Sequence, residues 1–376
     1  MVNLRLFFGL VFFVAFGQLV LLGAKFSRQR HAFLFYDDEA LFENAGNSTL
    51  GFHHIEYINL KNMFDRDDAI AMQSEIAGLD IDRFIAVSTD DINENGKGLP
   101  PSSSEERVLR ANEKACLRSH AQLWAKMIRN KWPSMLILEA DAAWDVNVRD
   151  ISKRSARGYN VLRQLFHPDS DQQPSRDDPF NIQTWDMLSF GTCQDDPKYR
   201  EEHTIFHDPD APLDQTWYEL PLKDQRVIRR SGYVVCTTAY AVSLRGARKL
   251  LLRAATDLDE PLDLMIGNMA LEDDIKVYAV YPPPIVQWQY TAGIGAENLG
   301  SSVQEQEKPK APNYKDIWKN IRQTKNIWQH SSYYHPYFRN GALQAYKKLA
   351  YPPDHDDQIK HQDEYDKLTT AKSESK

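Results

Sequence analysis

Cysteine, basic charge and internal repetition are all scarce in this chain. Only three cysteines occur among its 376 residues, too few for a disulfide scaffold, and their spacing fits no zinc site. The 45 Lys and Arg residues are outnumbered by 53 Asp and Glu residues, and the formal net charge is −8. No basic run offsets this balance, which argues against nucleic acid as a partner. No internal repeat is evident.

Long apolar runs are scarce as well, because only the stretch from Leu6 to Ala24 forms one. At about 1.5 Å per residue, a helix of this length extends roughly 28 Å, close to the hydrocarbon thickness of a bilayer. We therefore predict a cytoplasmic tail at residues 1–5 and a transmembrane signal-anchor at residues 6–24. A cleaved signal peptide is the alternative, with Ala15-Phe16-Gly17 as a small-x-small cleavage site.

Charge and a glycosylation sequon disagree about the orientation of this anchor. Arg5 precedes the apolar run, whereas Lys25 and Arg28 follow it. The positive-inside rule alone would place the C-terminal side in the cytoplasm. The sequon Asn47-Ser48-Thr49 can be used only in the lumen. We expect glycosylation at Asn47 and a lumenal folded domain.

The rest of the chain divides by composition and periodicity. Residues 25–52 are expected to form a stem and residues 53–299 the folded domain. Within the domain, short apolar runs predict strands, and the stretches between several of them predict helices. The strands are expected at residues 54–60, 82–87, 135–138, 187–190, 233–242 and 276–280. This alternation predicts an α/β fold with a mostly parallel central sheet flanked by helices.

Three further segments are described by their composition and capping residues. Ser102 and Glu105 form a capping box, which predicts a long helix ending near Lys131. Residues 300–352 are expected to be a linker and a C-terminal helical extension. Residues 353–376 form a charged tail that we expect to be disordered.

One predicted strand ends in a pair of acids. The apolar run 135–138 is followed by Glu139, Ala140 and Asp141. In an open α/β sheet, ligands bind outside the carboxyl ends of the strands. Two carboxylates spaced i and i+2 there can hold a divalent cation, which in turn binds a diphosphate. The alternative is a pair of solvated acids at a strand end.

The acidic motif is the third of five ordered sequence blocks. Together they resemble glycosyltransferase family 25, the lipopolysaccharide and collagen galactosyltransferase group, over residues 55–290. The blocks are Tyr57-Ile58-Asn59-Leu60 with Asp65-Arg66, Ala115 to Trp124, the acidic motif itself, Thr238 to Ala247, and Pro261-Leu262-Asp263 with Val277 to Gln287.

The resemblance implies a GT-A-like nucleotide-sugar-binding fold, inversion at the anomeric carbon, and Mn²⁺ or another divalent cation. It implies a UDP-galactose or UDP-glucose donor and a glycan or glycoprotein acceptor, in the Golgi or endoplasmic reticulum. Asn59 and Arg66 would lie near the nucleotide, and Glu139 and Asp141 would face the metal and diphosphate. This chain departs from the family pattern at Ala140, where the family usually has aspartate. A catalytically degenerate binding or scaffold protein is therefore an alternative, and a glycosidase with paired acids is another.

Four other residues are candidates for the site. Asp263 is the first candidate for the base that deprotonates the acceptor hydroxyl, with a helix-start acid as the alternative. His120 is a candidate catalytic residue, with a hydrogen-bonded structural histidine as the alternative. Asp90 and Asp91 form a loop pair that could contact the nucleotide.

The oxidising lumen predicts a disulfide. Cys116 falls inside the predicted long helix, where a buried, inert thiol is expected. Cys193 and Cys236 remain, and both follow or lie in strands of the predicted central layer. We predict a disulfide between them that closes a loop of about 43 residues. The alternative is three free, buried thiols.

Overall fold

The computed structural model describes residues 38–93, 95–104, 107–290, 319, 328–330, 346 and 348–351. The predicted signal-anchor at residues 6–24 and the predicted disordered tail at 353–376 lie outside this part of the chain. So do the start of the predicted stem and most of the predicted C-terminal extension. Within the described residues, no helix is both long enough and apolar enough to cross a membrane.

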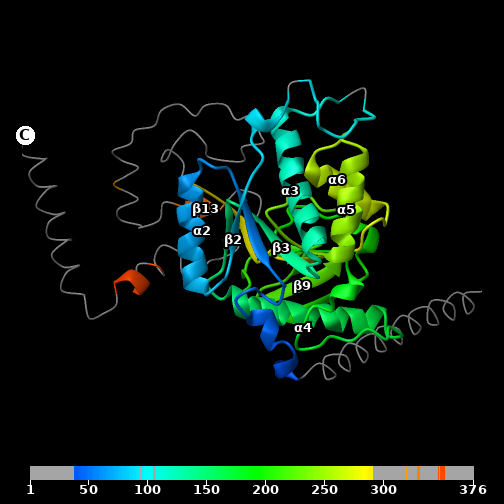
Figure 1. Ribbon diagram of the computed structural model, residues 1–376. Helices are drawn as coiled ribbons and strands as arrows, with labels where there is room; N and C mark the ends of the chain where they lie inside the picture. The colour runs from blue at the N-terminus through cyan, green and yellow to red at the C-terminus, as the bar shows by residue number, and fades with distance from the viewer. Residues whose placement is uncertain are drawn as a thin grey trace, which may run out of the picture.

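A mixed sheet forms the centre of the molecule (Figure 1). Parallel pairing joins β1 to β2, β1 to β3 and β5 to β11, whereas β9 and β10 run antiparallel to their neighbours. Most strands of the sheet thus run in the same direction, and the prediction of an α/β fold with a mostly parallel central sheet is confirmed. The eight described strands lie in the order β2 (Asp82–Ile85), β1 (Ile55–Asn59), β3 (Ser134–Glu139), β10 (Ala239–Ser243), β5 (Met187–Ser189), β11 (Val277–Tyr281), β9 (Gln225–Arg230) and β6 (His203–His207).

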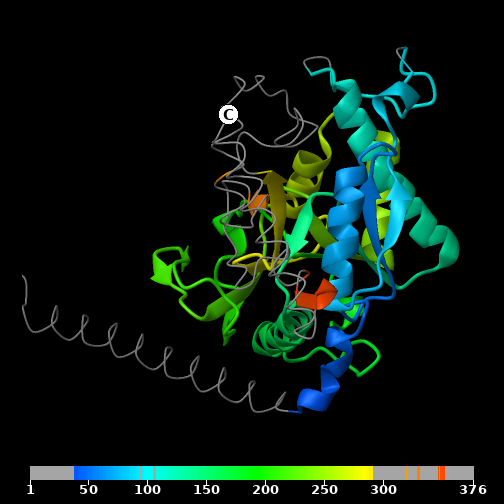
Figure 2. The same cartoon turned by 90° about the vertical axis from the view of Figure 1, so that its left-hand side faces the viewer.

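Helices cover both faces of this sheet, as the perpendicular views in Figures 1 and 2 show. Successive side chains of β3 point to opposite faces of the sheet, so both faces are apolar. Leu136 and Leu138 enter one apolar cluster, while Met135 and Ile137 enter another. The first cluster includes residues of α2 (Phe64–Ala77) and α4 (Val148–Phe166); the second includes residues of α3 (Ala111–Asn130), α5 (Leu244–Thr256) and α6 (Leu262–Leu271).

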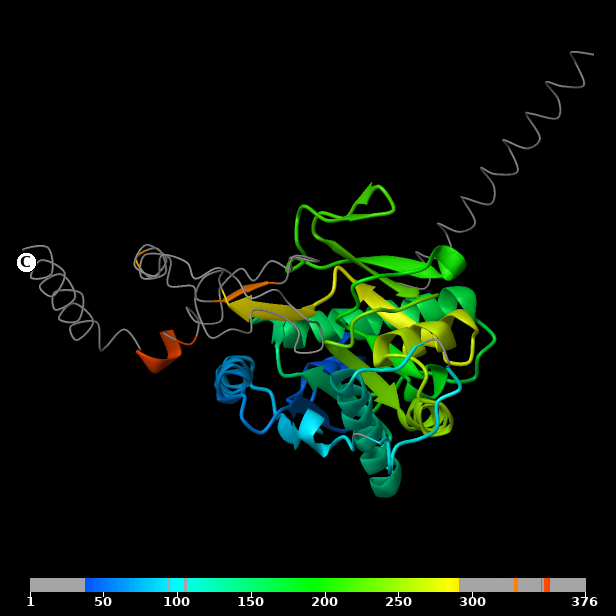
Figure 3. The same cartoon turned by 90° about the horizontal axis from the view of Figure 1, so that it is seen from above.

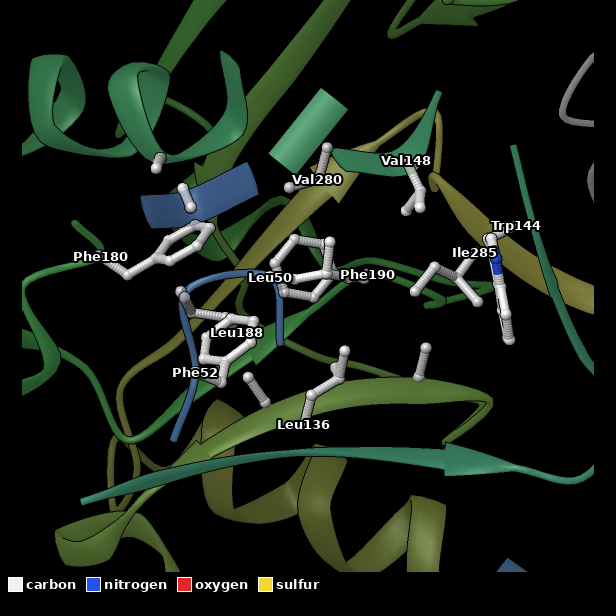
Figure 4. Close-up of a cluster of buried hydrophobic side chains, with 14 of the residues drawn as sticks. Leu50, Phe52, Leu136, Trp144, Val148, Phe180, Leu188, Phe190, Val280 and Ile285 are labelled. Carbon is white, nitrogen blue, oxygen red and sulfur yellow. The ribbon is translucent and has the colours of Figure 1, made fainter. Parts of the chain in front are cut away.

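Aromatic rings fill much of the first cluster (Figure 4). Phe52 stacks on Phe180 with ring centroids 5.0 Å apart and meets the edge of Phe190 at 6.0 Å. Leu136 and Leu188 project into the same cluster from β3 and β5. Because β3 is buried on both faces, its sequence is continuously apolar rather than alternating.

A small second sheet lies beside the end of β3. It consists of β4 (Ala142–Trp144), β12 (Ile285–Tyr290) and β13 (Trp328–His330), with β12 in the middle. Figure 3 shows β13 alongside β12, beyond the main sheet. The register pairs Gln287 of β12 with Ala142 of β4, which brings Gln287 next to the acidic motif.

Three local expectations are corrected by the structure. The long helix α3 begins at Ala111 rather than near Ser102, and it ends as predicted. Its capping carboxylate is Glu113, which accepts a hydrogen bond from the Arg110 backbone N–H at 2.8 Å. In the segment where the helix was expected to begin, the backbone N–H of Ser103 donates to Asp257, 154 residues away, at 2.8 Å.

The second correction concerns the strand expected over residues 233–242, because only Ala239–Ser243 is extended in the sheet. Cys236 lies before it in a loop, with φ at 69°. The third concerns the segment from Gln194 to Arg230, where no strand was expected. It contains β6 and β9 of the central sheet and a hairpin of β7 (Thr216–Trp217) and β8 (Leu220–Pro221). Figures 2 and 3 show this hairpin projecting from the body of the molecule.

Candidate functional site

The carboxyl ends of three parallel strands meet at one edge of the sheet. Ile58 pairs with Glu139 of β3, and the next residue, Asn59, pairs with Ile85 of β2. Asn59, Glu139 and the turn after β3 therefore share this edge, which is where ligands bind in open α/β sheets. The candidate site is built around Glu139 and Asp141.

Glu139 is held at the last position of β3 by its backbone and its side chain. Its N–H donates to the carbonyl of Thr238 at 2.9 Å. Its Oε1 accepts a hydrogen bond from the Thr237 hydroxyl at 2.6 Å. Burial raises the pKa of Glu139, as do the charges of Asp141 and Asp263, while the Thr237 bond and the charge of Arg66 oppose the rise. Four ionisable side chains thus act on one another at this edge.

The two carboxylate oxygens of Asp141 differ in their contacts. Its side chain is buried, with a residue exposure of 4%. Oδ2 accepts a hydrogen bond from Gln287 Nε2 at 2.9 Å and forms an ion pair with Arg66 at 3.3 Å. Oδ1 is buried and has no hydrogen-bond partner among the residues that the structure describes. A buried carboxylate oxygen in that state is costly unless a ligand completes it.

Ala140, between the two acids, faces the other way. It is 3% exposed and belongs to the first apolar cluster. An aspartate there would bring a charge into an apolar environment, which costs free energy unless the charge is paired. The i and i+2 carboxylates are therefore the ones that reach the site in this chain.

Asn59 ties the end of β1 to the start of α2. Its Nδ2 donates to the Met63 carbonyl at 2.9 Å and to Asp67 Oδ1 at 2.6 Å. Its Oδ1 is buried without a partner within the described ranges. Asp67 also accepts from the Tyr57 hydroxyl at 2.9 Å. This network fixes the first turn of α2, which carries Arg66 to Asp141.

Asp263 lies in the first turn of α6, two residues after the N-cap Pro261. Its Oδ1 accepts a hydrogen bond from the Leu264 backbone N–H at 2.9 Å. Its charge raises the pKa of Glu139 and, together with burial, that of Cys116. The structure thus brings Asp263 into the electrostatic neighbourhood of the acidic pair. The raised pKa of Cys116 fits the inert thiol expected there.

His120 lies in the core between α3 and β10. Its exposure is 1%, and Nδ1 lies 2.8 Å from the Tyr240 hydroxyl. The same hydroxyl accepts a hydrogen bond from Trp124 Nε1 at 3.1 Å. Burial lowers the pKa of His120 to about 3, so its imidazole is neutral. This geometry favours the hydrogen-bonded structural role of His120 over the catalytic one.

Asp90 and Asp91 follow β2 in the short 3-10 helix η3 (Thr89–Asp91), and both are exposed. Asp91 Oδ2 accepts hydrogen bonds from the backbone N–H and the hydroxyl of Ser88, each at 2.8 Å. These bonds lower the pKa of Asp91. Asp91 is therefore engaged in a local cap, and Asp90 is the member of the pair with a more open side chain.

Cys193 and Cys236 form a disulfide in the structure, with Cα atoms 5.6 Å apart.

Asn47 lies outside the candidate site around Glu139 and Asp141. It directly follows the segment Glu43–Gly46, which packs on α4. Its Oδ1 accepts hydrogen bonds from Thr49 and from the Gly51 backbone N–H. The oxygen is thus turned into the local loop, and Nδ2 is the atom to which a glycan would be joined.

Two side chains at the centre of the site were not among the predicted site residues. Thr237 is 98 residues from its partner Glu139, and Gln287 is 146 residues from its partner Asp141. Tyr290 adds a third long-range contact, donating its hydroxyl to Asp65 Oδ2 at 2.8 Å. The only sequence signals were indirect: Gln287 ends the last resemblance block, and Thr237 follows Cys236.

A comparison with known families identifies the family of this chain. The model of glycosyltransferase family 25, described as LPS biosynthesis protein, matches residues 52–266, which include the acidic motif and Asp263. The chain belongs to glycosyltransferase family 25. Gln287 and Tyr290 lie beyond the range that the family-25 model matches.

Several curated relatives carry the name "Glycosyltransferase 25 family member". The protein from Anopheles gambiae is 25% identical over 231 residues, covering 58% of this chain and 32% of the relative. The protein from Aedes aegypti is 26% identical over 231 residues, with the same coverage. The protein from Drosophila melanogaster is 25% identical over 230 residues, covering 59% of this chain and 31% of the relative. This family-25 chain therefore matches about a third of the length of these relatives.

Proposed function

We propose that this family-25 chain is a glycosyltransferase that moves a hexose, galactose or glucose, from a UDP-sugar to a hydroxyl group of a glycan or glycoprotein, with inversion and assisted by a divalent cation such as Mn²⁺. The observation that carries the proposal is the buried Oδ1 of Asp141, which has no hydrogen-bond partner among the described residues and lies beside Glu139 at the carboxyl end of β3. Membership of the family and the names of the relatives support the same reaction class.

Glu139 and Asp141 fit a divalent cation that also binds oxygens of the substrate. No group of three or more His, Cys, Asp or Glu side chains that could hold a metal occurs in the described part of the chain. Glu139 and Asp141 would therefore supply two carboxylates, and diphosphate oxygens and water would complete the shell. Mg²⁺-type sites in nucleotide-dependent enzymes are commonly built in this way. A bound cation would offset the charge that develops on the leaving UDP.

Arg66 would act on the same leaving group. Its guanidinium lies 3.3 Å from Asp141 Oδ2 and is mostly buried, with 16% of its side chain exposed. A guanidinium donates parallel hydrogen bonds to phosphate oxygens in a fixed geometry. We assign Arg66 to the diphosphate, with Gln287 keeping Asp141 in place when Arg66 turns toward the ligand.

Asp263 would be the base. Its Oδ1 is engaged by the Leu264 backbone N–H, which leaves Oδ2 for the acceptor hydroxyl. As the acceptor oxygen forms its bond to the anomeric carbon, the bond from that carbon to the diphosphate oxygen breaks. The hydroxyl proton passes to Asp263, and UDP leaves with the bonding electrons. Attack from the face opposite UDP inverts the anomeric carbon.

We further propose that the chain is a single-pass membrane protein of the Golgi or endoplasmic reticulum, with residues 6–24 as anchor and the folded domain in the lumen. The Asn47 sequon supports this, since glycosylation takes place there. The Cys193–Cys236 disulfide supports it too, because disulfides persist in oxidising compartments.

A ligand-induced shift in thermal stability tests the proposal. UDP and MnCl₂ together should raise the melting temperature of the protein more than either alone, because each completes the other's site. Asp141→Asn should remove this joint effect, while Asp169→Asn, at an exposed position, should retain it. The same preparation should hydrolyse one member of a panel of UDP-sugars. Joint stabilisation without turnover or transfer would indicate a degenerate binding protein, and no stabilisation at all would refute the proposal.

A further inference from the structure

The hydroxyl of Thr237 is the direct side-chain support of Glu139. Thr237 is 7% exposed, and its Oγ1 donates to Glu139 Oε1 at 2.6 Å. This bond occupies one carboxylate oxygen and leaves Oε2 for a ligand. A carboxylate without such a bond would rotate about its last torsion and would have to be ordered when the ligand binds.

Thr237 is in turn carried by a cross-linked loop. The preceding residue, Cys236, is joined to Cys193. The Cys193 backbone N–H donates to the Val235 carbonyl at 2.9 Å, and the Thr192 hydroxyl contacts the same carbonyl at 3.1 Å. Gln194 and Val235 form an antiparallel bridge. Two segments more than 40 residues apart are thus fastened together immediately before Thr237.

The backbone of this loop is in a conformation that needs outside support. Cys236 has φ at 69°, in the left-handed region that residues with a Cβ avoid. Such a conformation is unfavourable by itself and persists where the surroundings impose it. On the partner segment, a Cβ at Gly191 would lie 3.0 Å from both Ala239 N and Ile285 O. The cross-link and the hydrogen bonds from Cys193 and Thr192 to Val235 hold the loop in place.

We propose that Thr237 is a positioning residue that orients the Glu139 carboxylate for the cation and diphosphate, and that the Cys193–Cys236 disulfide holds Thr237 in register. This inference rests on the proposed function, because it gives Glu139 a ligand to bind. Partners of metal ligands fix the ligand's orientation, and their loss typically weakens metal binding by about 10–100-fold. Loss of the disulfide should have the same effect, since it acts through Thr237.

The first test measures Mn²⁺ affinity, with and without UDP, by electron paramagnetic resonance titration of the full-length protein. Thr237→Val keeps the shape of the side chain and should weaken Mn²⁺ binding about 10–100-fold. Thr237→Ser restores the hydroxyl and should restore most of the affinity. Thr204→Val is the matched control, because the Thr204 hydroxyl is buried and contacts no hydrogen-bond partner in the described part of the molecule.

The second test asks whether the disulfide acts through Thr237. A Cys193→Ser/Cys236→Ser double variant should lose as much Mn²⁺ affinity as Thr237→Val, and combining all three changes should add no further loss. Mild reduction of the folded wild-type protein, with the thiols counted, replaces the double variant if that variant does not fold.

The outcomes separate the two levels of the proposal. Wild-type affinity in Thr237→Val, or no rescue by Thr237→Ser, would overturn the positioning role while leaving the metal site intact. Additive losses from Thr237→Val and disulfide removal would overturn the coupling between them. A wild-type protein that binds UDP-sugar without any Mn²⁺ binding would instead refute the metal-assisted function on which the inference rests.

Discussion

Burial of a neutral histidine should make this protein sensitive to mild acid. His120 is 1% exposed and is bonded to the Tyr240 hydroxyl, and burial lowers its pKa from 6.5 to about 3. The unfolded chain exposes the imidazole, which then has its ordinary pKa. Below pH 6.5 the unfolded state therefore binds a proton that the folded state does not bind. The free energy of unfolding should fall as the pH falls from 6.5 toward 3.

The size of this effect follows from the two pKa values. One pKa unit corresponds to about 1.4 kcal/mol, so at pH 5 the unfolded state gains about 2 kcal/mol from His120. At pH 7 the contribution is close to zero. Domains are typically stable by about 5–15 kcal/mol, so a loss of this size is readily measured.

The assay is urea unfolding at pH 7 and pH 5 for the wild-type protein and for His120→Gln. Other groups also titrate over this range, but their contributions cancel when the two pH differences are subtracted. The variant should have a lower stability at pH 7, because the Tyr240 hydroxyl loses its histidine partner, and a pH dependence smaller by about 2 kcal/mol. His207→Gln, at a side chain that is 66% exposed, serves as the control.

Two results would refute this reasoning. A pH dependence unchanged by His120→Gln would mean that the imidazole is not held neutral in the core. A variant with wild-type stability and UDP affinity but a greatly reduced kcat would instead restore the catalytic role for His120.

Three further predictions concern other parts of the molecule. Asp263→Asn should lower kcat by about 10²–10⁴-fold, with UDP and Mn²⁺ affinity retained in binding titrations, and an unchanged kcat would exclude it as the base. Asp208→Ala should cost about 3–5 kcal/mol in urea unfolding, because it leaves the buried Arg226 guanidinium without its carboxylate; a cost below about 1 kcal/mol would contradict this. Asn47→Gln should abolish the gel-mobility shift caused by glycosidase treatment, whereas protease access to the folded domain in intact microsomes would contradict the lumenal orientation.

The fold class could be predicted because its signals are local. The apolar run of β3 is continuous because that strand is buried on both faces, and the acids begin where the strand ends. The helix α3 was predicted with the right end and the wrong start, because the segment that contains Ser102 is not helical and Ser103 bonds to Asp257 across the structure. A capping motif is a local pattern, and it does not record such tertiary contacts.

The antiparallel side of the sheet was missed for a related reason. The strand β9 contains Gln225, three arginines and only two aliphatic residues, which indicates a polar loop when taken alone. In the structure Arg226 is buried against Asp208, and Arg229 forms an ion pair with Asp195 at 2.9 Å. Charges that are neutralised by distant partners can occupy a buried strand. No periodicity in the sequence records that pairing.

The sequence by itself determined the family, the α/β class and the place of Glu139 and Asp141 at the end of a buried strand, because each of these can be recognised from short stretches of neighbouring residues and their order along the chain. Only the tertiary structure decided which carboxylate oxygens are engaged and which are open. Thr237 and Gln287 reach the two acids from 98 and 146 residues away, through a cross-linked loop and through the register of β12 on β4. Likewise, only the packing of α3 against β10 decided that His120 is a buried partner of Tyr240. Hydrogen bonds act over about 3 Å in space, so their partners are set by the fold and not by distance along the chain.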